Sequence, residues 1–347
     1  MRPEAREAMI EGMLRWANPS SPHAEGRAAR RALEDARERI KAALGWQGHI
    51  IFTSGASEAL AIAMRRAKGG RRWRSAVEHD AVLRAAPDAG VLPVNREWDV
   101  DPQAVADALA AGDRPVIAIQ WVNPETGKVQ PIERYAPQIA EGGGVMITDA
   151  SQLWGINRFP IRGDLIVLSA HKLGGPIGVG ALLVGDLALL EPVGGQEFGY
   201  RGGTENLPAA LGFAAAVEAW QAKRIGMPDM DRHWAKVDQY RTLEQYGARR
   251  QASYGEYVGT ITALTMPGLS AAAQLMRFDL KGFAVSAGSA CASGTLKRSR
   301  VLEAFGVKED EADRTIRVST GWSTTAEDVT RFTEAWIDIA MEAAARA

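Results

Sequence analysis

Cysteine is the scarcest reactive group in this chain: only one of the 347 residues, Cys291, is a cysteine. A single cysteine excludes an intrachain disulfide framework and is typical of a protein that works in a reducing compartment, so we expect a cytoplasmic location. The thiol is either a small core side chain or a reagent, and the cysteine count alone does not decide between these two roles.

Long apolar runs, excess charge and internal repeats are also missing. No apolar run approaches the length of a membrane span, and the opening MRPEAREAMIEGM does not resemble a signal peptide. The 41 Lys and Arg residues nearly balance the 42 Asp and Glu residues, so the bulk charge indicates neither a nucleic-acid nor a membrane partner. The length and the 46% of hydrophobic residues predict one large domain and a smaller one.

Short apolar runs that end in polar residues recur along the first half of the chain. They are His49–Phe52 before Thr53 to Glu58, Ser75–Val77 before His79, Pro115–Val122 before Asn123, Val145–Thr148 before Asp149 and Gln152, and Leu165–Leu168 before Ser169, His171 and Lys172. With helical stretches between them, they predict a mostly parallel sheet with helices on both faces. The carboxyl ends of parallel strands meet at one edge, where α/β proteins bind ligands, so these polar strand ends together predict a site.

Two of these strand ends allow more than one interpretation. A lysine at the position of Lys172 can be a surface charge, a phosphate clamp or an amine that forms a Schiff base with a carbonyl. The turn Thr53–Ser57, between a strand and a helix, can bind an anion through the free N–H groups of the helix start. An ordinary capped helix start explains the same turn equally well.

The second half of the chain has a different composition. Residues 226–228, Gly-Met-Pro, form the best boundary candidate, and a β-rich piece follows at Val258–Met266. The segment Phe283–Gly294 places Cys291 among Ser, Ala and Gly, which favours a mobile loop with an exposed thiol. Near the end, Thr315–Gly321 is expected to be a strand that carries Arg317, followed by a final helix.

Taken together, these motifs resemble the cysteine desulfurases of the class V aminotransferases, which use pyridoxal phosphate and have fold type I. The segments that carry the resemblance are FTSGASEA, VEHDAV, VNPETGKVQPI, ITDASQ, LSAHKLGGPIGVGAL, YRGGTEN, SAGSACASG and TIRVSTG, in the order of the family. The resemblance implies an α/β large domain at residues 1–225, with a mostly parallel seven-stranded sheet flanked by helices. It also implies a smaller C-terminal α+β domain at residues 226–347 that carries the cysteine loop.

The resemblance assigns a cofactor role to most of the polar strand ends. Lys172 would hold pyridoxal 5′-phosphate covalently and act as a base, while Asp149 would pair with the ring nitrogen. His79 would stack on the ring, and Gln152 would hydrogen-bond its phenolate oxygen. The phosphate group would be bound by Gly55, Ala56, Ser57, Ser169 and His171, and by Thr204 of the neighbouring subunit, which implies a homodimer with shared active sites.

The resemblance also implies a substrate and a sulfur route. Arg317 would bind the carboxylate of L-cysteine through a bidentate fork, assisted by Asn123. The Cys291 thiolate would take the sulfur as a persulfide and leave alanine, with His79 as the candidate proton acceptor. A sulfur-acceptor protein, such as an iron–sulfur scaffold or a tRNA-thiolation enzyme, would follow, with no metal and no direct nucleic-acid contact.

Three departures from the family pattern bear on these expectations. The chain begins at Met1-Arg2-Pro3, just after the short strand and Ala-Thr-rich turn with which the family usually starts. We therefore expect either a truncated or mis-assigned start, or a shortened N-terminal arm that has lost a wall of the pocket. Pro124 stands where many relatives have asparagine, and Ser57 stands where threonine is common. The first departure keeps open a non-catalytic sulfur carrier or scaffold with the same fold.

Rival enzyme functions would use some of the same residues. A selenocysteine lyase or another class V pyridoxal-phosphate enzyme would need the same cofactor residues, whereas a thiol hydrolase would leave Lys172, Asp149 and Arg317 without a purpose. Two basic clusters are most simply interpreted as solvated surface. The first comprises Arg65, Arg66, Lys68, Arg71, Arg72 and Arg74, and the second comprises Lys297, Arg298 and Arg300. The second cluster lies just after the cysteine loop, so its functional interpretation is a docking site for an acidic acceptor protein or a tRNA-modifying partner.

Overall fold

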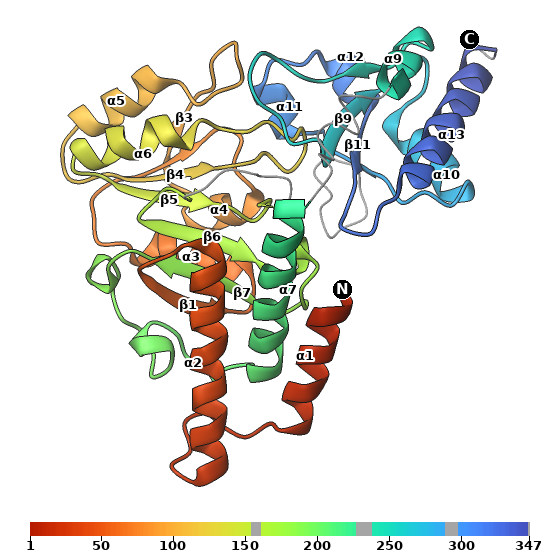
Figure 1. Ribbon diagram of the computed structural model, residues 1–347. Coiled ribbons are helices and arrows are strands. Elements are labelled where there is room, and N and C mark those ends of the chain that lie inside the picture. Colours follow the sequence, from red (N-terminus) through yellow and green to blue (C-terminus); the bar gives the residue numbers. More distant parts are fainter. Residues whose placement is uncertain (154–160, 227–237, 289–297, 346–347) are drawn as a thin grey trace. The chain divides into compact units, whose positions relative to one another are not determined.

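The computed structural model describes residues 1–153, 161–226, 238–288 and 298–345 (Figure 1). These residues form two compact units. The first comprises the described residues of Met1–Leu92, Val100–Trp121 and Gln130–Met227; the second comprises those of Pro93–Asp99, Val122–Val129 and Pro228–Ala347. The second unit therefore includes two short segments from the N-terminal half of the sequence.

A seven-stranded sheet forms the centre of the first unit, in the order β1-β7-β6-β5-β4-β2-β3. The strands are β1 (His49–Thr53), β2 (Arg72–Ser75), β3 (Gly90–Leu92), β4 (Val116–Gln120), β5 (Val145–Asp149), β6 (Leu165–Ser169) and β7 (Gly180–Val184). Only β7 opposes its neighbours, since it pairs antiparallel with β1 and β6 while the other pairs are parallel. The expected mostly parallel sheet is confirmed, and strands β1 to β6 end at one edge.

Strand β2 lies upstream of its predicted position. The sequence predicts Ser75–Val77, whereas the strand spans Arg72–Ser75 and residues 76 and 77 form a turn. Arginines occupy two of its four positions, and the first of them is bound locally, since the Arg72 guanidinium donates to the carbonyls of Ala67 and Gly69. The prediction depended on a run of apolar residues, and the arginines interrupt such a run in this strand.

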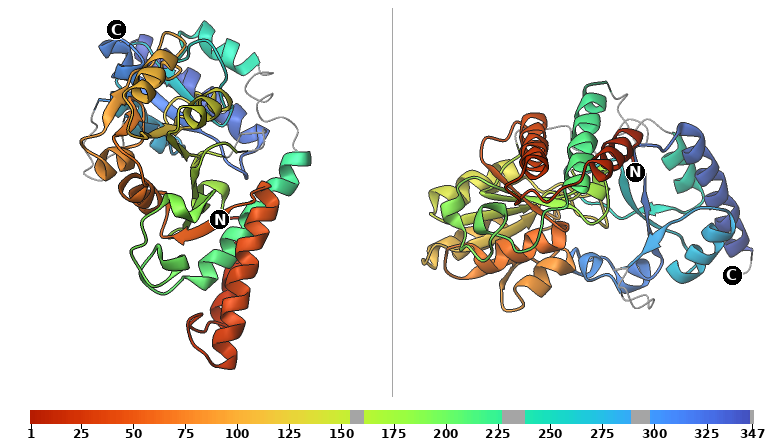
Figure 2. Two further views of the ribbon diagram at one scale, coloured as in Figure 1. Left: turned by 90° about the vertical axis from the view of Figure 1, so that its left-hand side faces the viewer. Right: turned by 90° about the horizontal axis from the view of Figure 1, so that it is seen from below.

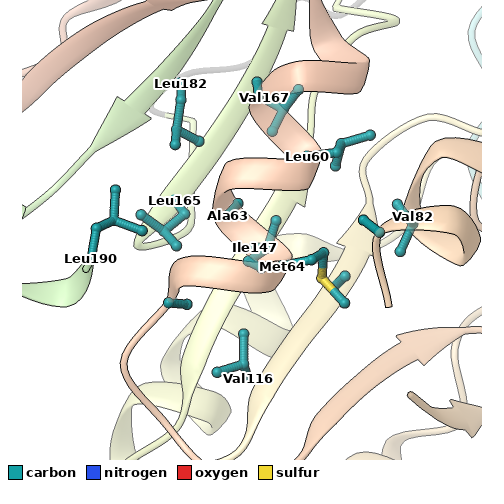
Figure 3. Packing of buried hydrophobic residues seen from close by; sticks show 14 of the residues in the cluster. Leu60, Ala63, Met64, Val82, Val116, Ile147, Leu165, Val167, Leu182 and Leu190 are labelled. Atoms are coloured by element: carbon teal, nitrogen blue, oxygen red, sulfur yellow. The ribbon is translucent and has the colours of Figure 1, made fainter. Parts of the chain in front are cut away.

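Helices cover both faces of this sheet (Figures 1 and 2). On one face α3 (Ala56–Arg66) packs on the strands and on α4 (Asp80–Ala85), as Figure 3 shows. The buried residues labelled there are Leu60, Ala63, Met64, Val82, Val116, Ile147, Leu165, Val167, Leu182 and Leu190. Truncating one such leucine to alanine costs about 2–5 kcal/mol of unfolding free energy, so this face holds α3 rigidly against the strand ends.

The other helices of the first unit complete its layers. They are α1 (Pro3–Leu14), α2 (Ala24–Leu44), α5 (Pro102–Ala110), α6 (Ile132–Glu141) and α7 (Leu207–Gly226). Helix α7 packs beside α1 and α2 (Figure 2), and α6 packs on β5 and α5. No helix in the described ranges is long and apolar enough to cross a bilayer.

The second unit contains a four-stranded antiparallel sheet in the order β10-β11-β9-β8. The strands are β8 (Arg249–Arg250), β9 (Ile261–Thr265), β10 (Ser286–Ala287) and β11 (Thr315–Ser319). The helices are α9 (Asp238–Gln245), α10 (Ala271–Leu280), α11 (Arg300–Ala304), α12 (Glu309–Ala312) and α13 (Ala326–Ala344). The mixed helix and antiparallel-strand composition expected for the C-terminal part is confirmed.

A buried ion pair ties the two N-terminal segments into the second unit. The Lys128 side chain is 1% exposed, and its Nζ lies 2.8 Å from an Asp99 oxygen and 2.9 Å from the Tyr254 carbonyl oxygen. Gly255 leaves room for this ammonium group, because a Cβ there would lie only 2.3 Å from Nζ. Lys128 thus joins three segments of the second unit and has a structural role.

Candidate active site

The turn that carries Lys172 projects from the carboxyl end of β6. Strand β6 passes directly into a 3-10 turn, Ala170–Leu173, and Gly174 ends the turn with φ +80°. His171 and Lys172 are exposed there, while Ala170 and Leu173 are buried. A buried strand followed by a tight turn therefore presents an amine and an imidazole at the edge of the sheet.

Ser169 and His171 form a hydrogen-bonded pair beside Lys172. The Ser169 Oγ lies 3.0 Å from the His171 Nδ1. Burial lowers the pKa of His171, and the positive charge of Lys172 lowers this pKa further. The lowered pKa favours the neutral ring, which can exchange a hydrogen bond with the hydroxyl.

Asp149 ends the neighbouring strand β5. It is 8% exposed and lies opposite Val167 of β6, and its Oδ1 accepts the Ser151 main-chain N–H at 2.9 Å. The Ser151 hydroxyl in the same turn is buried and has no hydrogen-bond partner among the described residues. Gln152 is half-buried in this turn. The turn thus offers one carboxylate and one unused hydroxyl close to the lysine-bearing strand.

A helix start follows the end of β1. Helix α3 begins at Ala56, and Gly55 precedes it with φ +151°, a backbone angle that side chains other than glycine rarely adopt. A Cβ on Gly180 would lie 2.8 Å from the Gly55 Cα, so β7 approaches this turn closely. Ser57 is exposed in the first helical turn. The arrangement leaves the first N–H groups of an 11-residue helix facing outward.

A salt bridge that the sequence pattern did not reveal supports this helix start. The Arg201 Nε donates to a Glu58 carboxylate oxygen at 2.9 Å, and the main-chain N–H of Ser54 donates to the other. Burial opposes ionisation of Glu58, but the hydrogen bonds from Ser54 and Arg201 outweigh it and hold the pKa of Glu58 below its usual range. Thr204, three residues after Arg201, lines a pocket together with Ser54. One chain therefore brings the YRGGTEN segment beside the helix start.

His79 caps helix α4 with its ring. Its Nδ1 accepts the Ala81 main-chain N–H at 3.1 Å, and its side chain is exposed. In the neutral ring the hydrogen therefore resides on Nε2, which makes His79 a hydrogen-bond donor at its free end.

A second feature missed by sequence reasoning positions His79. The preceding Glu78 is fully buried, and its Oε1 accepts from the Ser75 hydroxyl at 2.6 Å and from the Gln120 main-chain N–H at 2.8 Å. The Gln120 side chain in turn donates to the Val77 carbonyl at 2.6 Å. These bonds fix the turn between β2 and α4 to the neighbouring strand β4. A buried acid directly before a strand-end histidine is a sequence signal that could have indicated this anchor.

The structure thus brings most of the predicted cofactor residues to one sheet edge in the first unit. Those at this edge are Gly55, Ala56, Ser57, His79, Asp149, Gln152, Ser169, His171 and Lys172. Cys291 lies outside the described residues, as does Lys297. Asn123 and Arg317 belong to the second unit.

Within the second unit, Arg317 extends from β11 toward the 122–129 segment. Its Nη1 donates to the Pro124 carbonyl at 3.1 Å, and its Nε is buried without a hydrogen-bond partner among the described residues. Burial lowers the pKa of Arg317, and the negative charge of Glu125 acts in the opposite direction. The guanidinium group remains charged at all accessible pH values, so its unused face favours an anion.

Asn123 stabilises the turn that contacts Arg317. Its Oδ1 accepts the main-chain N–H groups of Glu125 and Thr126 at 2.9 Å each, and the Thr126 hydroxyl at 3.1 Å. Three donors on one oxygen fix the turn that presents the Pro124 carbonyl to Arg317.

Side chains of the basic clusters are bound within the protein. Arg72 caps the end of α3 through carbonyl oxygens, and Arg65 donates to the carbonyls of Arg84 and Ala85. In the second cluster Arg298 pairs with Glu309 and lies 3.7 Å from Asp313. These contacts favour a structural role for Arg65, Arg72 and Arg298.

The chain belongs to the class V aminotransferase family, whose model matches residues 6–332. Membership in this family implies pyridoxal phosphate as the cofactor. The chain is 33% identical to the cysteine desulfurase IscS of Dictyoglomus turgidum over 358 aligned positions, which cover 95% of the chain and 89% of that protein. It is 34% identical to the putative cysteine desulfurase IscS 1 of Bacillus subtilis, over 93% of the chain and 92% of that protein.

Solved structures agree with these relatives. A NifS-like protein from Rickettsia africae superposes with a TM-score of 0.87 at 29% identity, over 98% of the chain and 96% of that structure. SspA in complex with cysteine superposes with a TM-score of 0.75 at 29% identity, over 92% of the chain and 95% of that structure. The predicted fold type and family are therefore confirmed.

Proposed function

We propose that this protein is a cysteine desulfurase that depends on pyridoxal phosphate and moves the sulfur of L-cysteine onto Cys291, releasing alanine. The observation that carries this proposal is the exposed Lys172 in the turn after β6, next to the Ser169–His171 pair, with Asp149 at the end of the adjacent strand. The relatives that are cysteine desulfurases, and the structure of SspA with bound cysteine, support the choice of substrate.

The residues at the sheet edge fit pyridoxal phosphate chemically. Lys172 would hold the cofactor covalently through its ε-amino group, and the buried Asp149 would keep a proton on the ring nitrogen. Because the Ser54 N–H is already bound to Glu58, anion binding at α3 would fall to the N–H groups of Ala56 and Ser57. The Ser57 and Ser169 hydroxyls and the neutral His171 would complete the phosphate site.

When bound, pyridoxal phosphate supplies a conjugated ring that takes up the electron pair released at the substrate α-carbon. The chain itself must keep that ring oriented. Gln152 and His79 would do so from the turns that follow β5 and β2. Hydrogen bonds fix both turns to neighbouring strands, between main-chain groups after β5 and through the Glu78 and Gln120 side chains after β2.

Arg317 would bind the substrate carboxylate. Since its Nη1 already donates to Pro124, the Nε edge is the side that can form a two-bond fork with a carboxylate. Asn123 would assist by holding the turn that presents the Pro124 carbonyl to Arg317.

The sulfur transfer balances without an oxidant or reductant. The Cys291 thiolate attacks the cysteine sulfur, the S–S bond forms as the Cβ–S bond breaks, and the substrate carbon takes up a proton to give alanine. One thiol and one L-cysteine thus yield one persulfide and one L-alanine. Only the thiolate is a competent nucleophile, so a proton must leave Cys291 first.

His79 would accept that proton, and in doing so it would lose its hydrogen bond to the start of α4. Because its Nδ1 accepts the helix N–H, the neutral ring carries its hydrogen on Nε2 and has no lone pair there. Accepting a proton from Cys291 requires His79 either to shift its hydrogen to Nδ1 or to protonate Nδ1, and both release the cap of α4. Proton transfer and the cap of α4 are therefore linked.

Several further features belong to this proposal. We expect domains at residues 1–225 and 226–347, a cytoplasmic homodimer with shared active sites, and Thr204 acting on the partner's phosphate site. An acceptor protein for iron–sulfur assembly or tRNA thiolation would then remove the persulfide sulfur from Cys291.

The test is alanine formation from L-cysteine in the presence of a thiol reductant. Wild-type protein should form alanine, whereas Cys291→Ala and Cys291→Ser should form almost none while taking up pyridoxal phosphate as the wild type does. Equal alanine from all three would remove Cys291 from the reaction and indicate a lyase. No alanine from cofactor-loaded wild type would contradict the proposal.

A further inference from the structure

Arg2 is fully buried, which is unusual for a charged residue at the start of a helix. Its side-chain Nε donates to the Leu173 carbonyl at 2.9 Å, and its main-chain N–H donates to the Gly174 carbonyl at 2.7 Å. Both acceptors follow Lys172 directly in the chain. One residue from the beginning of the sequence thus binds the turn that carries the reactive amine.

The lysine turn needs such a partner. It is a 3-10 turn of four residues, and its last carbonyl groups cannot accept a hydrogen bond from an N–H of the turn itself. Within the turn, the Gly174 N–H reaches the His171 carbonyl only at 3.3 Å, whereas the Gly175 N–H reaches the Ala170 carbonyl at 2.9 Å. Arg2 therefore supplies two donors at the end of the turn where the internal hydrogen bonds are longest.

Close helix packing holds Arg2 in this position. A Cβ on Gly12 of α1 would lie 2.9 Å from the Pro208 Cα of α7. A Cβ on Gly212 of α7 would lie 2.6 Å from Pro176 and 2.9 Å from the Ala5 carbonyl oxygen. Helix α1, helix α7 and the segment after Lys172 thus meet where no further side chain fits.

The Leu173 carbonyl binds the buried guanidinium group, whereas the Gly174 carbonyl binds the main-chain N–H of Arg2. Burial lowers the pKa of Arg2, with the charge of Glu4 acting in the opposite direction, but a guanidinium group stays protonated in proteins. Its positive charge lies at the carbonyl end of the turn, which is the negative end of the local dipole. A hydrogen bond from a charged donor is stronger than a neutral one, so losing the Arg2 side chain should loosen the turn measurably.

We propose that Arg2 is a positioning residue for Lys172, because it fixes the Leu173 and Gly174 carbonyls and with them the direction in which the lysine leaves the sheet edge. The part of this inference that concerns cofactor binding rests on the proposed function. The contact between Arg2 and the turn does not.

Three variants test the role of Arg2. Arg2→Met removes the guanidinium group at similar volume, Arg2→Lys keeps the charge without the Nε donor, and Arg6→Met is the matched control, since Arg6 is exposed on the same helix. Two properties are measured on cofactor-free protein: the affinity for pyridoxal phosphate by absorbance titration, and hydrogen exchange of the peptide that contains residues 170–175. The pH midpoint of the visible absorbance band is then compared among the loaded proteins.

The proposal has a definite expected result. Arg2→Met should bind pyridoxal phosphate about tenfold more weakly or worse, exchange faster at residues 170–175, and show a shifted pH midpoint. Arg2→Lys should lie between Arg2→Met and the wild type, and Arg6→Met should match the wild type in all three measurements.

Different results would overturn it. Wild-type affinity, exchange and pH midpoint in Arg2→Met would show that Arg2 does not position the turn, and so would a lower melting temperature with normal affinity and midpoint. If even the wild type took up no pyridoxal phosphate, the proposed function would fail. Hydrogen exchange would then decide alone: faster exchange in Arg2→Met would support the anchor, and unchanged exchange would refute it.

Discussion

The two units of this protein hold their polar groups in different ways. In the first unit, Lys172, Asp149 and His79 each follow a strand of one sheet, so short sequence patterns determine where they lie. In the second unit, the surroundings of Arg317 come from segments far apart in the sequence, since Pro124 accepts its hydrogen bond and Ser299 donates to Glu125. A site built on strand ends can be read from local sequence, whereas a site built from distant loops depends on tertiary structure.

The largest expected effect is on the first unit. Lys172→Ala should remove covalent cofactor binding and lower alanine formation by a factor of about a thousand or more, since a catalytic base alone contributes about 10²–10⁴. Absorbance spectra and alanine assays measure both effects. Lys68→Ala, which removes an exposed lysine, is the control and should behave as the wild type. Substantial activity in Lys172→Ala would show that the reactive group does not lie at the sheet edge of the first unit, and the comparison of the two units would fail.

Arg317→Lys should distinguish the role of the second unit, substrate binding, from that of the first unit, cofactor binding. The substitution keeps a charge but loses the fork, so KM for L-cysteine should rise about tenfold to a hundredfold, which corresponds to a charged hydrogen bond of about 1.5–3 kcal/mol. Pyridoxal phosphate affinity should stay unchanged, because the cofactor residues belong to the first unit. Unchanged KM, or a loss of cofactor binding, would contradict this division of roles.

Two substitutions of His79 distinguish its ring chemistry from its cap. Asparagine is a good helix N-cap, so His79→Asn should keep the stability of the protein within about 0.5 kcal/mol of the wild type and lose most activity. His79→Ala should lose activity and about 1 kcal/mol of unfolding free energy as well. Urea unfolding and alanine assays check both variants, and full activity in His79→Asn would exclude a proton-transfer role for the ring.

The Glu58–Arg201 pair predicts a dependence of stability on acid pH. The lowered pKa of Glu58 means that the unfolded chain binds this proton first as the pH falls. The contribution of the ionised carboxylate is therefore complete above the ordinary carboxyl pKa of 4.5 and is lost as the pH falls through the lower folded value.

Urea unfolding at several pH values measures that contribution as the difference between wild type and Glu58→Gln. The difference should be at most about 1 kcal/mol at neutral pH, because the pair is partly exposed, and should shrink below pH 4.5. A difference that grows on acidification would contradict the assignment of Glu58.

The smallest expected effect concerns His171. Its pKa is lowered by burial and by Lys172, so its ring should titrate below 6.5 in cofactor-free protein, and the stabilisation of its neutral form should be lost as the pH falls through that region. NMR of the ring should show this midpoint move upward in Lys172→Ala. A midpoint at or above 6.5 in the wild type would contradict the charge arrangement at the sheet edge.

The sequence predicted those parts of the fold and the site that follow from short runs of neighbouring residues. Buried runs such as Leu165–Ser169 gave the sheet and its polar edge, because four apolar residues ended by turn formers have few other structures. It failed at β2, where arginines occupy strand positions, and it did not anticipate the Glu58–Arg201 pair or the anchor made by Arg2. Those contacts join residues 143 and 171 positions apart, and no periodic pattern encodes such a pairing.

A single turnover without reductant tests the central claim most directly. Cofactor-loaded protein is mixed with one equivalent of L-cysteine per chain, and alanine, free sulfide and the mass of the peptide containing Cys291 are measured together. The account predicts about one alanine per chain, one added sulfur atom on Cys291 and almost no free sulfide. One alanine per chain with an equal amount of free sulfide and an unmodified Cys291 would contradict it and indicate a lyase.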